Sequence, residues 1–252
     1  DPRVTGVLPV ALDRATRLAQ LMLTGGKQYT GILCLHDDVE LEKLKKGIAK
    51  FVGKIMQMPP VRSAVKRQLR ERSIYSFEIL EIDGRNVLFS VDCEAGTYIR
   101  KLCHDLGLVL GVGGHMADLR RTRVCHFNET DLVSLQDLQD ALTFWKEGND
   151  KFIRYCIRPA ERLVEHLHKV WVFDSAVESI CHGRAVAIPG ISKITPLTIG
   201  KDVAIMTLKD ELVALGVAQM NHSDVLSKEK GIAITTKKVF MLPGTYPVDR
   251  VE

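Results

Sequence analysis

The sequence lacks the cysteine patterns that mark a disulfide scaffold or a zinc site. Its six cysteines are scattered through 252 residues and form no Cys-x-x-Cys pair. A chain of this length builds a hydrophobic core without disulfides, so we expect free thiols and a cytoplasmic location. Three cysteines stand before a histidine, but these pairs are too far apart for the short, repeated ligand spacings of zinc sites. We therefore expect no metal.

Long apolar runs, internal repeats and low-complexity segments are also absent from the sequence. No run approaches the roughly 20 residues that cross a bilayer, so we expect no membrane partner. The stretch Gly111-Val-Gly-Gly114 follows an expected helix instead of a strand, which argues against a phosphate-binding loop. We expect no cofactor.

What is present is the composition of an ordinary globular protein with a mild excess of positive charge. Hydrophobic residues make up 46% of the chain and charged residues 26%, and the formal net charge is +4. This balance permits a nucleic-acid partner without requiring one, so the distribution of charge has to decide. The segment 62–72 follows two prolines and carries five cations against one acid. It is either a solvated helix face or a loop that grips RNA.

Hydrophobic periodicity predicts an α+β protein. Helical spacing of apolar residues is found over 11–23, 41–51, 97–110 and 135–145. A strand is expected over 29–36, and the runs 77–82 and 87–93 predict a hairpin. Beyond about residue 168 one short helix is expected over 174–181, among short β-type runs at 185–188, 203–207, 212–220, 232–235 and 238–242. Many short strands in so few residues predict a small β-barrel.

Three segments carry side chains that suit chemistry on a nucleic-acid base. Asp1 lies on a turn constrained by proline and glycine, which presents its carboxylate. Arg100 lies one position off the buried stripe of an expected helix, from where it can pair with a carboxylate and keep it ionised. Lys27 and Tyr29 project from one side of a strand, and a tyrosine there suits stacking on a base. The alternatives are an Asx turn for Asp1 and an ordinary edge-strand packing role for Tyr29.

Together these segments resemble the TruB-type pseudouridine synthases. The motifs occur in the family's order over nearly the whole chain: Asp-Pro-x-x-x-Gly-x-Leu at 1–8, Lys-x-Tyr at 27–29, Pro-Pro-x-x-Ser-Ala-x-Lys at 59–66, Gly-Thr-Tyr-Ile-Arg at 96–100 and Leu-Arg-Arg at 119–121. The stretches 63–72 and 106–123 look like the dyskerin-type branch of the family, and more like its archaeal members than its nucleolar ones. The segment 169–246 resembles a PUA domain, an RNA-binding module.

The resemblance implies a role for each matching position. Asp1 would be the catalytic carboxylate that attacks the target uridine, Tyr29 would stack on the flipped base, and Arg100 would pair with Asp1. Leu119 would line the pocket. Residues expected to bind the substrate strand are Lys27, Arg62, Lys66, Arg67 and Arg70. The family also has residues upstream of the Asp-Pro step, so we expect this chain to be a fragment that lacks them.

The resemblance also implies a domain organisation and a set of partners. A mixed-sheet catalytic domain would span residues 1–168, and a small β-barrel PUA domain 169–252. The implied partners are a box H/ACA guide RNA, a substrate rRNA or tRNA, small protein subunits on the catalytic domain, and a kink-turn-binding protein that acts through the RNA. Candidates for guide-RNA contacts in the PUA domain are Gly183, Arg184, Lys237 and Lys238, with ordinary surface residues as the alternative.

Three functions remain open from the sequence. The first is an RNA-guided synthase that modifies rRNA within a particle. The second is a stand-alone synthase that modifies position 55 in the tRNA T-arm. The third is a non-catalytic RNA-binding scaffold in which Asp1 has no catalytic role. The combination of Asp1, Tyr29 and Arg100 argues against the scaffold, and the dyskerin-like stretches favour the first function over the second.

Overall fold

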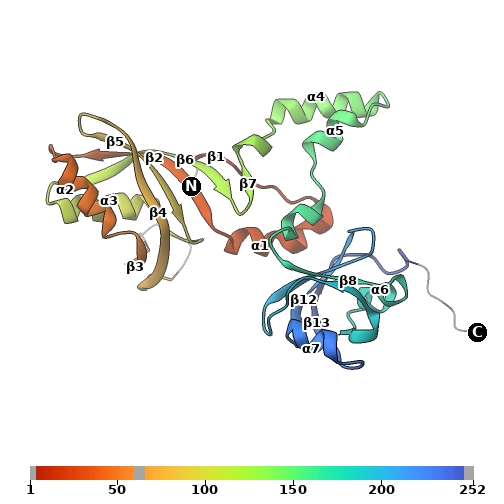
Figure 1. Cartoon of the computed structure of the whole chain (residues 1–252). Helices are drawn as coiled ribbons and strands as arrows, with labels where there is room; N and C mark the ends of the chain where they lie inside the picture. The colour runs from red at the N-terminus through yellow and green to blue at the C-terminus, as the bar shows by residue number, and fades with distance from the viewer. Residues whose placement is uncertain (1–3, 60–65, 247–252) are drawn as a thin grey trace, which may run out of the picture. The chain divides into compact units, whose positions relative to one another are not determined.

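The structure, a computed structural model, describes residues 4–59 and 66–246 (Figure 1). Its contacts divide the described chain into two compact units. Unit 1 consists of residues 4–10 and 20–134, and unit 2 of residues 11–19 and 135–246. In these ranges no helix is both long enough and apolar enough to cross a membrane.

Unit 1 is built on a seven-stranded mixed sheet. Six strands follow the order β1-β6-β2-β5-β4-β3, and β7 pairs with β6. Every pairing is antiparallel except that of β1 with β6. The strands are β1 (Thr5–Gly6), β2 (Lys27–Leu35), β3 (Gly53–Gln57), β4 (Arg70–Asp83), β5 (Asn86–Cys93), β6 (Gly114–Val124) and β7 (Phe127–Asn128).

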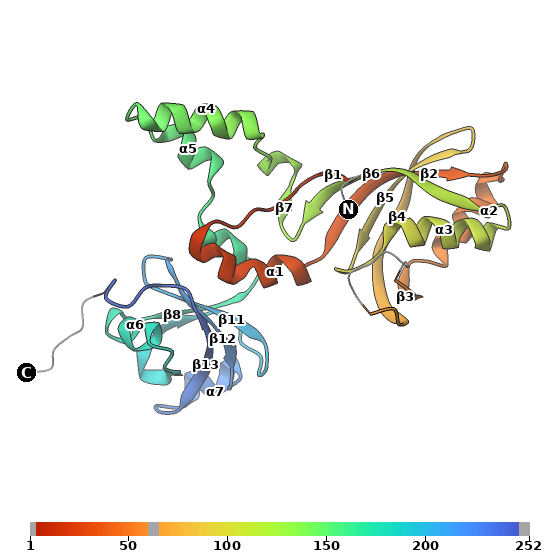
Figure 2. The same ribbon diagram turned by 180° about the vertical axis from the view of Figure 1, so that it is seen from behind.

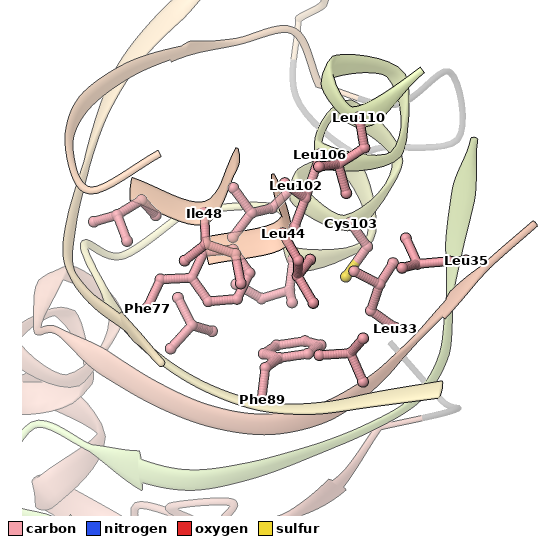
Figure 3. Packing of buried hydrophobic residues seen from close by; sticks show 14 of the residues in the cluster. Leu33, Leu35, Leu44, Ile48, Phe77, Phe89, Leu102, Cys103, Leu106 and Leu110 are labelled. Atoms are coloured by element: carbon pink, nitrogen blue, oxygen red, sulfur yellow. The ribbon is translucent and has the colours of Figure 1, made fainter. Parts of the chain in front are cut away.

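Two helices, α2 (Leu41–Ala49) and α3 (Ile99–Leu110), pack against one face of this sheet (Figure 1). Side chains of both helices meet Phe77 and Phe89 of the sheet, as Figure 3 shows. The two phenylalanine rings pack edge to face with centroids 5.4 Å apart. Each fully buried leucine or phenylalanine in this core stabilises the fold by about 1.5–3 kcal/mol. This core fixes the N-terminal end of α3 relative to the strands.

Unit 2 contains a six-stranded mixed sheet in the order β10-β8-β11-β12-β13-β9, drawn from behind in Figure 2. Its strands are β8 (His168–Val172), β9 (Val186–Ala187), β10 (Ile191–Ile194), β11 (Asp202–Met206), β12 (Leu212–Ala218) and β13 (Ile232–Val239). Its helices are α4 (Leu135–Lys146), α5 (Lys151–Cys156), α6 (Asp174–Cys181) and α7 (His222–Ser227). Short 3-10 turns lie at η1 (Asp13–Leu18), η3 (Ala160–Val164) and η4 (Ile188–Gly190), and a further turn, η2 (Glu129–Asp131), belongs to unit 1. The predicted α+β class, with a mixed-sheet domain and a second small β domain, is confirmed.

The structure corrects two of the predicted elements. The helix expected over 11–23 is the 3-10 turn η1 followed by α1 (Ala19–Thr24). Of the predicted apolar face, Leu18 is buried and Ala15, Ala19 and Met22 are half-buried, but Leu12 is 54% exposed. The turn begins at Asp13 with a positive φ of 45° and winds with three residues per turn, which moves side chains off the 3.6-residue stripe.

The second correction concerns strands, and the structure also bears on one alternative left open for the basic segment. The runs 232–235 and 238–242 are not separate, because β13 continues through Thr236 and Lys237 to Val239. The basic segment 62–72 does not form a helix face where it is described, because residues 66–69 have no regular structure and Arg70 begins β4.

Candidate active site

A pocket of about 420 Å³ opens in unit 1 where four segments meet. The segments are β1 with the residues around it, the first part of β2, the turn that begins α3, and β6. The lining residues among those described are Val4, Thr5, Gly6, Leu8, Tyr29, Thr97, Tyr98, Ile99, Arg100, Met116, Leu119 and Arg121. Three predicted site residues, Tyr29, Arg100 and Leu119, therefore face one cavity. Asp1 lies outside the described residues, and the first described residue of the lining is Val4.

Arg121 joins two sides of this pocket. Its Nε donates to the carbonyl oxygen of Val7 at 2.7 Å, and its own carbonyl accepts the N–H of Val7 at 2.8 Å. Its guanidinium also lies close enough to Tyr29 to act on the pKa of the phenol. Burial raises the pKa of Tyr29 above its usual value, whereas the charge of Arg121 and its hydrogen bond lower it. One side chain thus ties the segment that follows Asp1 to the aromatic ring in the pocket.

Gly6 lets this segment approach β6 so closely. Its φ is +96°, and it pairs with Arg121 in the register of β1 and β6. A Cβ on Gly6 would lie 2.1 Å from the Arg121 carbonyl oxygen, a distance that no side chain can occupy. The glycine in the first sequence motif is therefore a structural requirement of the pocket wall.

Arg100 is the second residue of α3, at the end of a tight turn. Gly96 has a φ of +79°, and the Thr97 hydroxyl donates to the carbonyl of Glu94 at 2.7 Å. The helix buries Ile99, Leu102, Cys103, Leu106 and Leu110 as its periodicity predicts, and Arg100 is exposed beside them. This turn places the guanidinium of Arg100 at the pocket.

Leu119 lines the pocket beside Gly31 of β2, a position without a side chain. Its side chain is 5% exposed and lies opposite Gly31 in the register of β2 and β6. A Cβ on Gly31 would be 2.8 Å from Leu119 Cδ1 and equally close to the ring of Phe89. The missing side chain at Gly31 therefore provides the space that Leu119 fills.

The comparisons with known proteins cover nearly the whole chain. Residues 1–41 and 35–99 match the family described as TruB family pseudouridylate synthase (N terminal domain). Residues 100–165 match the tRNA pseudouridylate synthase B C-terminal domain, and residues 168–240 match the PUA domain. The chain belongs to the TruB family.

Relatives and solved structures agree with this assignment. "Probable tRNA pseudouridine synthase B" of Methanopyrus kandleri is 52% identical over 98% of this chain and 74% of its own length. The protein of the same name from Pyrococcus furiosus is 54% identical over 98% of this chain and 74% of its own. The chain is 53% identical, with a TM-score of 0.91, to a protein solved as "Crystal Structure of a Cbf5-Nop10-Gar1 Complex", over 98% of this chain and 76% of that one.

A second solved structure, "Structure of H/ACA RNP bound to a substrate RNA containing 2'-deoxyuridine", is 50% identical with a TM-score of 0.90, over 98% of this chain and 76% of that one. These matches confirm the predicted family, its PUA domain and its enzyme class: the TruB-family chain is a pseudouridine synthase, an isomerase. The domain boundary between residues 168 and 169 stays a prediction.

The cations predicted to bind substrate lie in different surroundings. Lys27 is not among the described residues that line the pocket, and its Nζ donates to the carbonyls of Met22, Leu23 and Gly25 at 2.9–3.3 Å. Lys66 and Arg67 are exposed, as a phosphate-binding role requires, whereas Arg62 lies outside the described residues. Arg70 is half-buried at the start of β4.

The four PUA candidates are gathered at one place in unit 2. Gly183, with a φ of +85°, ends α6, and the carbonyl of Arg184 accepts the Thr236 hydroxyl at 2.7 Å. Lys237 and Lys238 follow Thr236 on β13, and both are exposed. Lys237 pairs with Asp202 at 3.2 Å across an exposed ion pair of small energetic weight. Their contact with RNA stays a prediction.

Sequence reasoning missed Arg121. The motif Leu119-Arg120-Arg121 indicated a role only for its leucine, although Arg121 lines the pocket and acts on the pKa of Tyr29. Its neighbour Arg120 instead pairs with Glu129, with Nε and Oε1 2.5 Å apart. The alternation of side chains along a strand was the signal available, because Leu119 and Arg121 point to the same face of β6.

Proposed function

We propose that this chain is the catalytic subunit of a box H/ACA guide-RNA particle that isomerises uridine to pseudouridine in rRNA. The observation that carries the proposal is the similarity of the chain, over nearly its full length, to proteins solved in complexes with Nop10, Gar1 and an H/ACA substrate RNA. In this proposal the carboxylate of Asp1 acts on the target uridine at the pocket lined by Tyr29, Arg100 and Leu119.

The reaction conserves all atoms of the nucleotide. The bond between uracil N1 and ribose C1′ breaks, the uracil turns, and C5 forms a new bond to C1′. The proton that leaves C5 is balanced by one gained at N1, so no oxidant, reductant or co-reactant is needed. Asp1 must be ionised to serve as a nucleophile or a base, and a neighbouring guanidinium, Arg100, favours that form of a carboxylate.

Tyr29 supplies a surface for a base that has left its stack. An enzyme that acts on a base must extrude it from the helix, and stacking on an aromatic ring offsets part of that cost, by about 1–3 kcal/mol. The ring of Tyr29 packs against the core of unit 1, so it is held in place before substrate arrives. Leu119 provides an apolar wall that keeps water from the reacting atoms.

The particle would bring RNA to this pocket through further contacts. Lys66 and Arg67 are exposed cations that suit the phosphates of the substrate strand. The PUA domain would hold the 3′ end of the guide near Gly183, Arg184, Lys237 and Lys238. Small protein subunits would bind the catalytic domain, and a kink-turn-binding protein would act through the guide RNA.

A second candidate function is the modification of tRNA without a guide. It is favoured by the names of the curated relatives, which describe tRNA pseudouridine synthase B. The pocket chemistry is the same in both cases, because the reacting atoms belong to one nucleotide. The two functions differ only in how the RNA is delivered.

A conversion assay with and without guide RNA separates the two functions. The substrates are an rRNA fragment complementary to the guide and a tRNA transcript, and pseudouridine is measured after nuclease digestion. We expect conversion of the rRNA fragment only when the guide and the small protein subunits are present. Guide-independent conversion of the T-arm uridine, at an equal or higher rate, would establish the second function instead.

The role of Asp1 is tested by Asp1→Asn in a chain that carries the residues upstream of Asp1 in its relatives. The amide keeps the shape of the side chain but cannot be a nucleophile or base, so we expect loss of detectable pseudouridine formation while guide-RNA binding is retained. Asp83→Asn, at an exposed position at the end of β4, is the matched control. A normal conversion rate in Asp1→Asn would refute the assignment.

A further inference from the structure

Gln57 is a buried polar side chain whose hydrogen bonds serve a single residue far away in sequence. It is 3% exposed, at the end of β3. Its Oε1 accepts the backbone N–H of Tyr98 at 3.0 Å, and its Nε2 donates to the carbonyl oxygen of Tyr98 at 3.3 Å. The side-chain amide thus hydrogen-bonds both the N–H and the carbonyl of Tyr98, as the backbone of a neighbouring strand would.

Tyr98 is the residue on which the start of α3 depends. It flanks the helix with extended dihedral angles, φ −95° and ψ 100°, and its carbonyl accepts the N–H of Leu102 at 3.0 Å. Gln57 and the first hydrogen bond of α3 therefore meet at one oxygen atom. Any displacement of Tyr98 shifts the first turn of the helix, in which Arg100 lies.

The same turn forms one wall of the pocket. Four consecutive residues from Thr97 to Arg100 line it, and Gln57 is not among the described lining residues. Gln57 itself is held by the register of β3 and β4, in which it lies opposite Arg70. A side chain on a strand, with both polar ends satisfied, is a more rigid support for a site than the turn itself.

We propose that Gln57 is a positioning residue of the pseudouridine synthase: it acts through the backbone of Tyr98 to hold Arg100 in its working place. The inference rests on the proposed function, because it assumes that Arg100 acts at the reacting uridine. Gln57 touches no substrate in this proposal. Its effect is on the rate of the chemical step, with little effect on RNA binding.

The test is a double-mutant cycle on turnover. Gln57→Met keeps the length of the side chain and removes both hydrogen bonds, and it is combined with Arg100→Ala. We expect Gln57→Met alone to lower kcat by about 10- to 100-fold, the cost of a misplacement near 1 Å, with KM for RNA almost unchanged. In the Arg100→Ala background the same substitution should cause little further loss.

Controls separate positioning from general destabilisation. Val87→Ala removes buried volume from the same sheet at a position away from the pocket lining, and it should leave kcat unchanged at temperatures where the protein is folded. If Gln57→Met does not fold, Gln57→Glu is used, because it keeps the acceptor for the Tyr98 N–H and removes only the donor.

The outcomes distinguish the inference from the proposed function. A normal rate in Arg100→Ala contradicts the role of Arg100 itself. If Arg100→Ala is impaired but Gln57→Met has a normal kcat, the inference about Gln57 alone is overturned. The same holds if the two losses of kcat multiply in the double variant.

Discussion

At the scale of single residues, the pocket depends on an arginine that the motifs did not single out. Tyr29, Arg100 and Leu119 were predicted to meet, and they do line one cavity. Arg121 was missed because its partner is set by a strand irregularity: the register of β2 and β6 shifts between Gln28 and Tyr29, so that Tyr29 lies opposite Arg121. Side-chain alternation puts Arg121 on the same face as Leu119, but such a shift comes from backbone packing, so the sequence did not identify Tyr29 as its partner.

The first prediction concerns the phenol of Tyr29. Burial raises its pKa, and Arg121 opposes that rise through its charge and its hydrogen bond to the hydroxyl. Arg121→Met removes the opposing effect, so we expect the pKa of Tyr29 to rise further. A pH titration followed by NMR of tyrosine labelled with ¹³C at Cζ measures it.

The control for that titration is Arg123→Met. Arg123 lies on the same strand but pairs with Asp92, with its Nη2 2.6 Å from the carboxylate. This substitution should leave the Tyr29 titration where it is in the unmodified protein. An unchanged or lowered Tyr29 pKa in Arg121→Met would show that Arg121 does not act on the phenol.

At the scale of elements, Lys27 stabilises the end of a helix. Its ammonium donates to three carbonyl groups at the C-terminal end of α1, the negative end of the helix dipole. Burial lowers the pKa of Lys27, and the three acceptors satisfy all its N–H donors. This geometry favours a structural role over the predicted contact with substrate.

The second prediction therefore concerns Lys27→Met, which keeps most of the apolar stem and removes the charge. We expect the free energy of unfolding to fall by about 1 kcal/mol, since a charge and hydrogen bonds at a helix end are lost. RNA affinity and kcat should stay the same. Denaturant unfolding and a filter-binding assay measure the two quantities.

Lys43→Met, at an exposed position on α2, is the matched control and should change neither stability nor affinity. If Lys27→Met weakens RNA binding without lowering stability, the substrate contact predicted from the motif is correct and the helix-end role is not the important one.

The sequence predicted some elements well and others not at all. The helix over 97–110 was predicted because five of its apolar residues follow a 3.6-residue period, and all five are buried in the structure, whereas Leu108 and Val109 lie off this stripe and are exposed. Strand β6 was not predicted, although it lies between β1 and β2 in the sheet. Its alternation is interrupted by Arg120, Arg121 and Arg123, each of which has a partner in the structure. Because these charges find their partners only in the folded state, the sequence pattern does not indicate a strand here.

At the scale of the whole molecule, the chain combines two modules with separate cores. The core of unit 1 lies between its sheet and helices α2 and α3, and unit 2 has a core of its own around β8, β11, β12 and β13. A substitution on the surface of one module therefore leaves the packing of the other intact. This separation allows RNA binding and chemistry to be tested independently.

The third prediction uses that separation. Arg184→Ala combined with Lys237→Ala removes two cations from the PUA domain, and we expect guide-RNA affinity to fall. The slope of log K against log salt should decrease in magnitude by about 1–2, since up to two phosphate contacts are lost. Binding isotherms at several salt concentrations give both values.

Lys43→Ala combined with Lys50→Ala removes the same charge from exposed positions in unit 1 and serves as the control. An equal loss of affinity and slope in both pairs would mean that the predicted PUA contacts are no more than part of the overall positive charge.

The close approach of Gly31 and Leu119 has a consequence for how this pocket can change. Side chains at the two positions compete for the same space, because any atom added at 31 would meet the end of the leucine at 119. A side chain at 31 would also meet the ring of Phe89 and the backbone carbonyl of Asp118, so a smaller residue at 119 does not by itself make room for it. Substitutions at the lining positions alone, made to change which bases the pocket accepts, do not remove this steric limit at position 31. Position 31 therefore stays glycine in any remodelling of the cavity, and the space is enlarged by shortening the leucine alone, for example by Leu119→Val.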